Sequence, residues 1–156
     1  MAARGYVAKS GSSGTVTTPV AMAAGVAKSV VGVLGGSGDT LNVDEVGLSF
    51  DGVTSSAVPA LVELLEISAL GTMSAFTPVQ TYGAALASSA TAGYNASAEP
   101  TVVAVRKAWY VPVFNGLFVV QFPLGKEPSV SASRGFALRV NAPAIVNCVP
   151  YIEYSE

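Results

Sequence analysis

Histidine is absent from the 156 residues of this chain, and cysteine occurs once. The first absence removes the commonest general base, the usual zinc ligand and the base of a Ser-His-Asp triad. The single cysteine excludes an intramolecular disulfide framework. Because Cys148 is in phase with Val146, Ile152 and Tyr154, we expect a small buried hydrophobe there and not a nucleophile. We therefore expect that the chain is not an enzyme and needs no cofactor.

Charge is scarce as well. Charged residues make up 12% of the chain, which is half of the roughly 25% usual for soluble domains, and the net charge is −2. The chain has no Lys/Arg cluster that could neutralise phosphates, so we expect no nucleic-acid partner. It also has no uncharged apolar run of about 18 residues, so we expect no membrane span. Apolar residues make up 51%. We expect neighbouring subunits or a partner to cover part of this surface, and a Ser/Thr-rich polar surface is the alternative.

Residues 1–18 are rich in Gly, Ser and Thr and show no periodicity. This composition predicts an extended N-terminal arm or disordered tail outside the core, with residues 19–156 forming one folded domain. The apolar run of a secretory signal is missing near Arg4 and Lys9, so we expect synthesis in the cytoplasm.

Several segments favour β-strands. Residues 28–34 are rich in Val and Leu, and residues 41–50 alternate between apolar and polar. The apolar phase of the second segment slips by one residue at Asp44-Glu45, which predicts a β-bulge there. Residues 57–67 fit a helical face and a strand equally well. Residues 70–99, rich in Ala, Ser and Thr, are predicted to form a long loop of the kind that is usually functional or contacts a partner, with room for a short strand or helical turn.

The C-terminal third contains four apolar runs, over residues 102–114, 117–124, 136–142 and 145–154. Asn115-Gly116 between the first two predicts a β-hairpin with a type I′ turn. Pro112 cannot donate a ladder hydrogen bond, so the first run should lie at a sheet edge or carry a bulge. Residues 117–122 are apolar on both faces, as in a central strand covered on both sides. Phe136, Leu138 and Val140 alternate with smaller or polar residues, which places one face in the core.

Carboxylates are the remaining candidates for catalysis, since paired Asp/Glu groups serve as acid and base in glycoside hydrolysis. Asp44 and Glu45 are adjacent on a predicted strand and face opposite ways unless a bulge re-aims one of them. Glu63 and Glu66 diverge on a strand and are neighbours on a solvated face of a helix. We expect solvated surface for both pairs. The candidates for a calcium site are Asp39, Asp44 and Asp51, but no D-x-D-x-D-G spacing supports one. Trp109 and Tyr110 could stack a sugar, although core or interface packing is the favoured use.

Several short stretches resemble one family of phage proteins. They are Val46-Gly47-Leu48-Ser49-Phe50-Asp51-Gly52, Ala57-Val58-Pro59, Val62-Glu63-Leu64-Leu65, Ala98-Glu99-Pro100-Thr101, Gln121-Phe122-Pro123-Leu124-Gly125-Lys126-Glu127 and Ala142-Pro143-Ala144-Ile145-Val146-Asn147. The chain thereby resembles the head decoration (cement or minor capsid) proteins of tailed phages that infect actinobacteria, over about residues 28–156. The resemblance implies an all-β, single-domain antiparallel β-sandwich, jelly-roll-like, and favours a strand over residues 57–67.

The same resemblance implies a structural virion protein on the capsid exterior. Its partner would be the major capsid protein, and it would form a homo-oligomer, with a trimer favoured. It carries over no catalytic, cofactor or metal residues. We expect the N-terminal arm to supply one capsid contact through Arg4, Tyr6 and Lys9. The alternative is a tail- or capsid-associated jelly roll that binds host surface glycans, for which Tyr82 and Tyr94 are the candidate aromatics.

Overall fold

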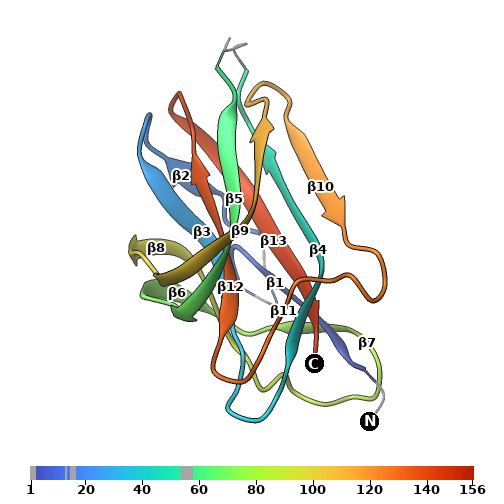
Figure 1. Ribbon diagram of the computed structural model, residues 1–156. Helices are drawn as coiled ribbons and strands as arrows, with labels where there is room; N and C mark the ends of the chain where they lie inside the picture. Colours follow the sequence, from blue (N-terminus) through green and yellow to red (C-terminus); the bar gives the residue numbers. More distant parts are fainter. Residues whose placement is uncertain (1–2, 13, 15–16, 54–57) are drawn as a thin grey trace.

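The computed structural model describes residues 3–12, 14, 17–53 and 58–156, and every regular element within them is a β-strand (Figure 1). One sheet has seven strands: β1 (Gly5–Lys9), β2 (Val20–Met22), β4 (Leu41–Phe50), β7 (Val79–Tyr82), β10 (Leu117–Gln121), β11 (Ser129–Val130) and β13 (Val146–Ser155). The second has six: β3 (Ala27–Leu34), β5 (Ala60–Ala69), β6 (Thr72–Phe76), β8 (Thr91–Ala98), β9 (Thr101–Val111) and β12 (Gly135–Asn141). These residues include no helix that could cross a membrane.

The strand order is that of a jelly-roll β-sandwich. The main path of the seven-stranded sheet is β10-β4-β13-β1-β7, and the six-stranded sheet runs β6-β8-β3-β12-β5-β9. Eight of these strands (β1, β3, β4, β5, β9, β10, β12 and β13), numbered in chain order, lie 1-8-3-6 in one sheet and 2-7-4-5 in the other. Of the other five strands, β6, β7 and β8 come from one insertion and widen both sheets at the side of β3 and β1, whereas β2 pairs with β13 and β11 pairs with β4. The predicted all-β, jelly-roll-like sandwich is confirmed.

The core lies between the two sheets. Phe136, Leu138 and Val140 of β12 are fully buried, as their alternation predicts. On β4, the register with β13 steps from the pair Glu45–Glu153 to the pair Val43–Tyr154, so Asp44 is the extra residue of a β-bulge. The bulge returns the apolar residues of β4 to the core face on both sides of the slip, as predicted.

The ambiguous segment at residues 57–67 is a strand from Ala60 onward. Val62 and Leu64 of β5 are fully buried in the main core. Leu65 and Ile67 form a second small cluster with Ala137, against which Leu34 and Leu70 pack. Both faces of this strand are therefore covered, which explains why its pattern reads equally well as a helix. Residues 54–57 lie outside the described residues.

The prediction that residues 1–18 stand outside the core is wrong for β1. This strand pairs with β13 along its whole length and with β7 on its other side. The Tyr6 side chain is only 1% exposed, and Ala8 is fully buried. A short strand between two partners needs few large apolar residues, because backbone hydrogen bonds to both neighbours stabilise it. Residues 1–2, 13 and 15–16 of the predicted arm lie outside the described residues.

The predicted hairpin at Asn115-Gly116 is wrong. Strand β9 pairs with β5 in the six-stranded sheet, whereas β10 pairs with β4 in the seven-stranded sheet. Asn115 does adopt a positive φ of 48°, but it belongs to a crossing between the layers. The crossing is held by hydrogen bonds from Phe50 N to Gly116 O and from Asn115 N to Gly52 O. Gly116 has no positive φ, so the predicted type I′ turn is wrong as well as the inferred strand partner.

Two further expectations change with this topology. Strand β10 lies at the edge of its sheet, and Leu117 is 75% exposed, so the predicted central strand at residues 117–122 is wrong. Strand β9 is an edge strand, as Pro112 predicts.

The prediction that residues 70–99 form a long loop is wrong for most of them, which form β6, β7 and β8. These strands are largely exposed, so they carry little apolar pattern.

Candidate functional site

The predicted carboxylate pair on β5 is divided between separate ion pairs. Glu63 accepts a hydrogen bond from Arg139 Nε at 2.8 Å, and Glu66 pairs with Arg106 and, at 4.0 Å, with Arg134. Each carboxylate thus has its own cationic partner. This arrangement favours a structural role for both residues and not an acid and base of one site.

The bulge at Asp44 brings the second predicted pair together. Asp44 and Glu45 both lie on the outer face of the seven-stranded sheet, where Glu153 is directly opposite Glu45 on β13. Asp44 accepts hydrogen bonds from Tyr82 Oη at 3.2 Å and from Ser155 Oγ at 3.1 Å, and Glu45 accepts one from Tyr151 Oη. We call this group, Asp44, Glu45, Tyr82, Tyr151 and Glu153, the tyrosine–carboxylate face.

Two glycines position the tyrosines of this face. Tyr82 is the cross-strand partner of Gly5, and Tyr151 is the partner of Gly47. A Cβ atom on Gly5 would lie 2.0 Å from Tyr82 Cε1, and one on Gly47 would lie 2.4 Å from Tyr151 Cε1. Each ring therefore rests against a backbone that has no side chain, an arrangement known to stabilise glycine in sheets. Tyr82 remains 51% exposed.

The carboxylates of the face are electrostatically unfavourable. Burial raises the pKa of Asp44, opposed by its hydrogen bonds from Ser155 and Tyr82. Burial also raises the pKa of Glu153, and the charges of Glu45 and Asp44 raise it further. Like charges directly opposite on neighbouring strands destabilise a sheet. The face thus costs stability at neutral pH.

We expect the variant Glu153→Gln to be more stable than the parent at neutral pH. The folded pKa of Glu153 lies above its ordinary value of 4.5, so protonation favours the folded state. This stabilising contribution is complete below the ordinary pKa and is lost as the pH rises through the folded pKa. Because Glu153 is only half-buried and water still screens its charge, we expect a gain in melting temperature of only about 1–2 °C at neutral pH. The difference should vanish near pH 4, as measured by thermal unfolding.

Asp51→Asn is the control of opposite sign. Asp51 accepts hydrogen bonds from Asn147 N at 2.7 Å and Asn147 Nδ2 at 2.6 Å, which hold the pKa of its carboxyl below the ordinary value. Its contribution is present above the ordinary pKa and lost as the pH falls through the folded pKa, so this variant should melt lower at neutral pH. Equal responses of the two variants would contradict the electrostatic account.

An open two-lobed cleft borders the face, and Asp44, Tyr82, Leu124 and Glu127 line both lobes. One lobe, of about 430 Å³, adds Gln121 and Glu153, and the other, of about 370 Å³, lies toward Ser155. Each volume is within the range of small-ligand sites. We call this feature the Tyr82 cleft.

The other predicted sites are not assembled. Asp39, Asp44 and Asp51 lie before, within and after the single strand β4, which keeps them apart, and the described residues hold no acidic or sulfur cluster fit for a metal ion. Trp109 packs on Phe118 with ring centroids 5.0 Å apart, whereas Tyr110 is exposed, so they form no joint platform.

Two further predictions concern buried side chains. Cys148 is 1% exposed, and burial raises the pKa of its thiol to about 12, so the predicted small hydrophobe is confirmed. Tyr94 packs against the main core and is not an exposed sugar platform.

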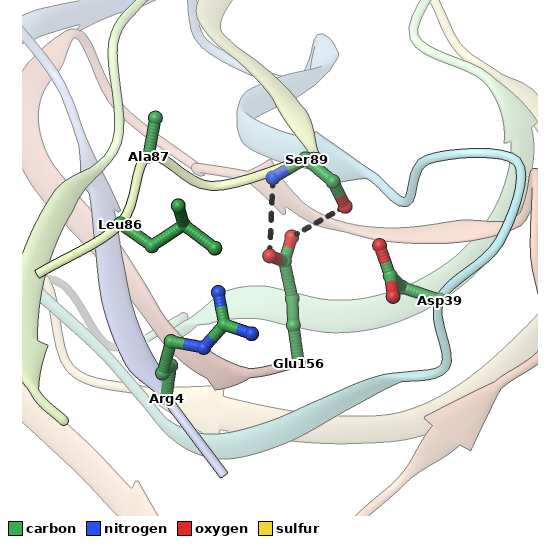
Figure 2. A pocket seen from close by; sticks show the side chains of 6 residues that line it. All are labelled: Arg4, Asp39, Leu86, Ala87, Ser89 and Glu156. Carbon is green, nitrogen blue, oxygen red and sulfur yellow. Dashed lines mark hydrogen bonds between the residues drawn. The ribbon is translucent and has the colours of Figure 1, made fainter. Parts of the chain in front are cut away.

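The three predicted capsid contacts lie in different surroundings. Tyr6 is a core residue, Lys9 is half-buried at the end of β1, and Arg4 lies at a pocket of about 380 Å³ beside the last residue of the chain. Figure 2 shows the Arg4 side chain directed toward Glu156, whose carboxylate accepts hydrogen bonds from Ser89 N at 3.1 Å and Ser89 Oγ at 3.2 Å. Tyr6 therefore cannot reach a partner while β1 stays paired. For Arg4 and Lys9 the capsid contact remains a prediction.

One end of the sandwich is apolar. The connections β2–β3, β4–β5, β9–β10 and β12–β13 all lie at the end remote from the chain termini (Figure 1). We call the described residues of these connections (23–26, 51–53, 58–59, 112–116 and 142–145) the apolar end. They include a single charged residue, Asp51, which is hydrogen-bonded to Asn147. The exposed apolar side chains there are Val26 (54%), Val53 (86%), Val58 (60%), Phe114 (44%) and Ile145 (84%).

The two ends differ in chemistry. At the apolar end, Met22, Val26 and Ile145 line an open pocket of about 340 Å³ whose walls are mostly hydrocarbon, with Lys28 as the charged residue of its lining. At the opposite end, the pocket in Figure 2 includes Arg4, Asp39 and Glu156. Five of the fifteen exposed large apolar side chains of the described residues thus lie at this one end of the molecule.

Most residues of the tyrosine–carboxylate face and of the apolar end could not be identified as sites from the sequence. The phase slip at Asp44-Glu45 signalled the bulge, but Tyr151 and Glu153 join the face only through the pairing of β4 with β13. The apolar end comes from four separate connections, each too short to stand out alone. Comparison of the chain with protein-family models, with curated proteins and with solved structures finds no match.

Proposed function

We propose that this chain is a structural virion protein that binds the outer surface of a phage capsid as a decoration or cement protein and stabilises the shell. The observation that carries the proposal is the apolar end, where five large apolar side chains are exposed among residues with one charge. A group of exposed apolar side chains on a protein surface is usually a site where another protein binds. The resemblance of the sequence to decoration proteins supplies the identity of the partner, the major capsid protein.

The physical basis of such a role is mass action. A protein that binds the assembled lattice, and not its free subunits, shifts the equilibrium toward the lattice. If the protein is a homo-oligomer, with a trimer favoured, several apolar ends would engage one shell together. The resulting avidity exceeds the affinity of one copy without new contacts. The absence of histidine and the separate ion pairs of Glu63 and Glu66 are consistent with a role that needs no catalysis.

The test is cosedimentation of the purified protein with empty shells of the major capsid protein. We expect the parent to pellet with the shells in many copies per particle and to raise their melting temperature. Ile145→Asp and Val53→Asp should each lower shell binding by about tenfold or more, because a charge placed against an apolar partner surface is desolvated without a counter-ion.

Leu86→Asp is the matched control, since Leu86 is also exposed (56%) but lies at the opposite end of the molecule. It should bind shells like the parent. All three variants should melt within about 2 °C of the parent, because each replaces an exposed side chain. Equal loss in the control, or unchanged binding of Ile145→Asp and Val53→Asp, would remove the apolar end from the proposal. A failure of the parent to bind shells would end the proposal itself.

A further inference from the structure

We propose that the Tyr82 cleft binds a neutral pyranose sugar, with the Tyr82 ring as the stacking platform and the surrounding polar groups as acceptors for its hydroxyls. This site is separate from the apolar end and does not depend on attachment to a shell.

The platform comes from the position of Tyr82 at the end of β7. Its ring rests on the side-chain-free backbone of Gly5, and its hydroxyl is fixed by Asp44 Oδ2 at 3.2 Å. The residue is nevertheless 51% exposed and lines both lobes of the cleft. An aromatic ring that is held on one side and open on the other offers its negative face to the polarised C–H groups of a pyranose. Because the ring is already anchored, little side-chain entropy remains to be lost on binding.

The acceptors lie around this platform. Asp44, Glu127 and Glu153 line the larger lobe, together with the Gln121 amide. Sugar hydroxyls are donors that ionised carboxylates accept strongly, and an amide both donates and accepts. Leu124 and Phe122 add apolar contact on the remaining wall. One aromatic face with a few converging polar groups is the usual composition of a small-ligand site.

Charge narrows the class of sugar. All charged residues that line the two lobes are acidic. An anionic sugar such as a uronate or sialic acid would be repelled at short range. The acidic lining therefore excludes anionic sugars from the ligand class that we propose.

The experiment is saturation-transfer NMR of the whole chain with methyl glucoside, methyl galactoside and methyl mannoside, and with methyl glucuronide as the anionic probe. We expect saturation of the ring C–H protons of at least one neutral glycoside and at least threefold weaker binding of the glucuronide. Tyr82→Leu should weaken binding by about three- to tenfold, and Tyr82→Phe, which keeps the ring, should stay within about twofold of the parent.

Tyr110→Leu is the matched control, because Tyr110 is exposed on edge strand β9 far from the cleft, and it should bind like the parent. The inference is overturned if no neutral glycoside is saturated, if Tyr82→Leu binds like the parent, or if a trilysine peptide displaces the glycoside fully and binds more tightly. A thermal unfolding scan of Tyr82→Leu serves as the check that this variant remains folded, with an expected melting temperature within about 2 °C of the parent. Shell binding by Tyr82→Leu should be unchanged, so failure here is distinguishable from failure of the proposed function.

Discussion

Replacing Tyr6 by alanine should destabilise the fold by about 3–5 kcal/mol, the range seen when large aromatic side chains are removed from protein cores. Tyr6 is 1% exposed and stacks on Tyr154, with ring centroids 5.7 Å apart. Its hydroxyl also donates to Leu86 O at 3.1 Å. Domains of this size are stable by only about 5–15 kcal/mol, so the loss would be a large share of the total. Urea denaturation gives the free energy of unfolding directly.

Two variants separate the contributions of Tyr6. Tyr6→Phe keeps the ring and loses only the hydrogen bond to Leu86 O, so about 1 kcal/mol should be lost. Val7→Ala lies on the same strand but is half-buried on the other face, and it should also cost about 1 kcal/mol or less. If Tyr6→Ala is as stable as the parent, then β1 contributes nothing to the core and the arm predicted from sequence is correct after all.

The burial of Tyr6 could not be predicted from the sequence around it. The segment around it is rich in Gly, Ser and Thr, so its composition favours disorder. Its stability comes from pairing with β13, which is almost 150 residues away in the chain and has the strong apolar alternation. Local composition reports the side chains of one segment and not the backbone partners that another segment offers. The same reason explains β6, β7 and β8, whose side chains are largely exposed.

The features predicted correctly are those that depend on one strand alone. The period-2 pattern of β12 correctly predicts which of its faces is buried, and the phase slip in β4 correctly predicts its β-bulge. The apolar residues in phase with Cys148 on β13 correctly predict that its side chain is buried. Each of these follows from which way successive side chains point. The jelly-roll order, in contrast, depends on pairings between distant strands, so no pattern within one strand predicts it.

The candidate sites also combine features that depend on one strand with features that depend on the pairing of distant strands. The bulge made a meeting of Asp44 and Glu45 conceivable from sequence, but Glu153 lies more than 100 residues further along the chain and joins them only through the register of β13 with β4. The apolar end is divided among four connections that meet because the strands on either side are antiparallel. A surface formed in this way has no continuous sequence motif.

Replacing Gly116 by alanine should destabilise the fold by about 1–3 kcal/mol, the usual cost of overpacking a well-packed site. A Cβ atom at this position would lie 1.7 Å from Pro112 O, which belongs to the backbone and cannot rotate away. The carbonyl of Gly116 also accepts the hydrogen bond from Phe50 N at 2.9 Å, so the crossing cannot move without breaking that bond. Urea denaturation measures the loss, and shell binding measures whether the apolar end is displaced with it.

Gly38→Ala is the matched control, because nothing lies within 4 Å of its added Cβ atom, and its stability should stay within about 0.5 kcal/mol of the parent. Gly116 links the fold and the proposed function, since the crossing that it permits sends β9 and β10 into different sheets and places Phe114 at the apolar end. A type I′ hairpin between β9 and β10 would also disfavour alanine at Gly116, because its second turn residue needs a positive φ. Equal stability of the two glycine variants would contradict the close approach of Gly116 to Pro112 O in the crossing, and a selective loss in Gly116→Ala is the result that this approach predicts.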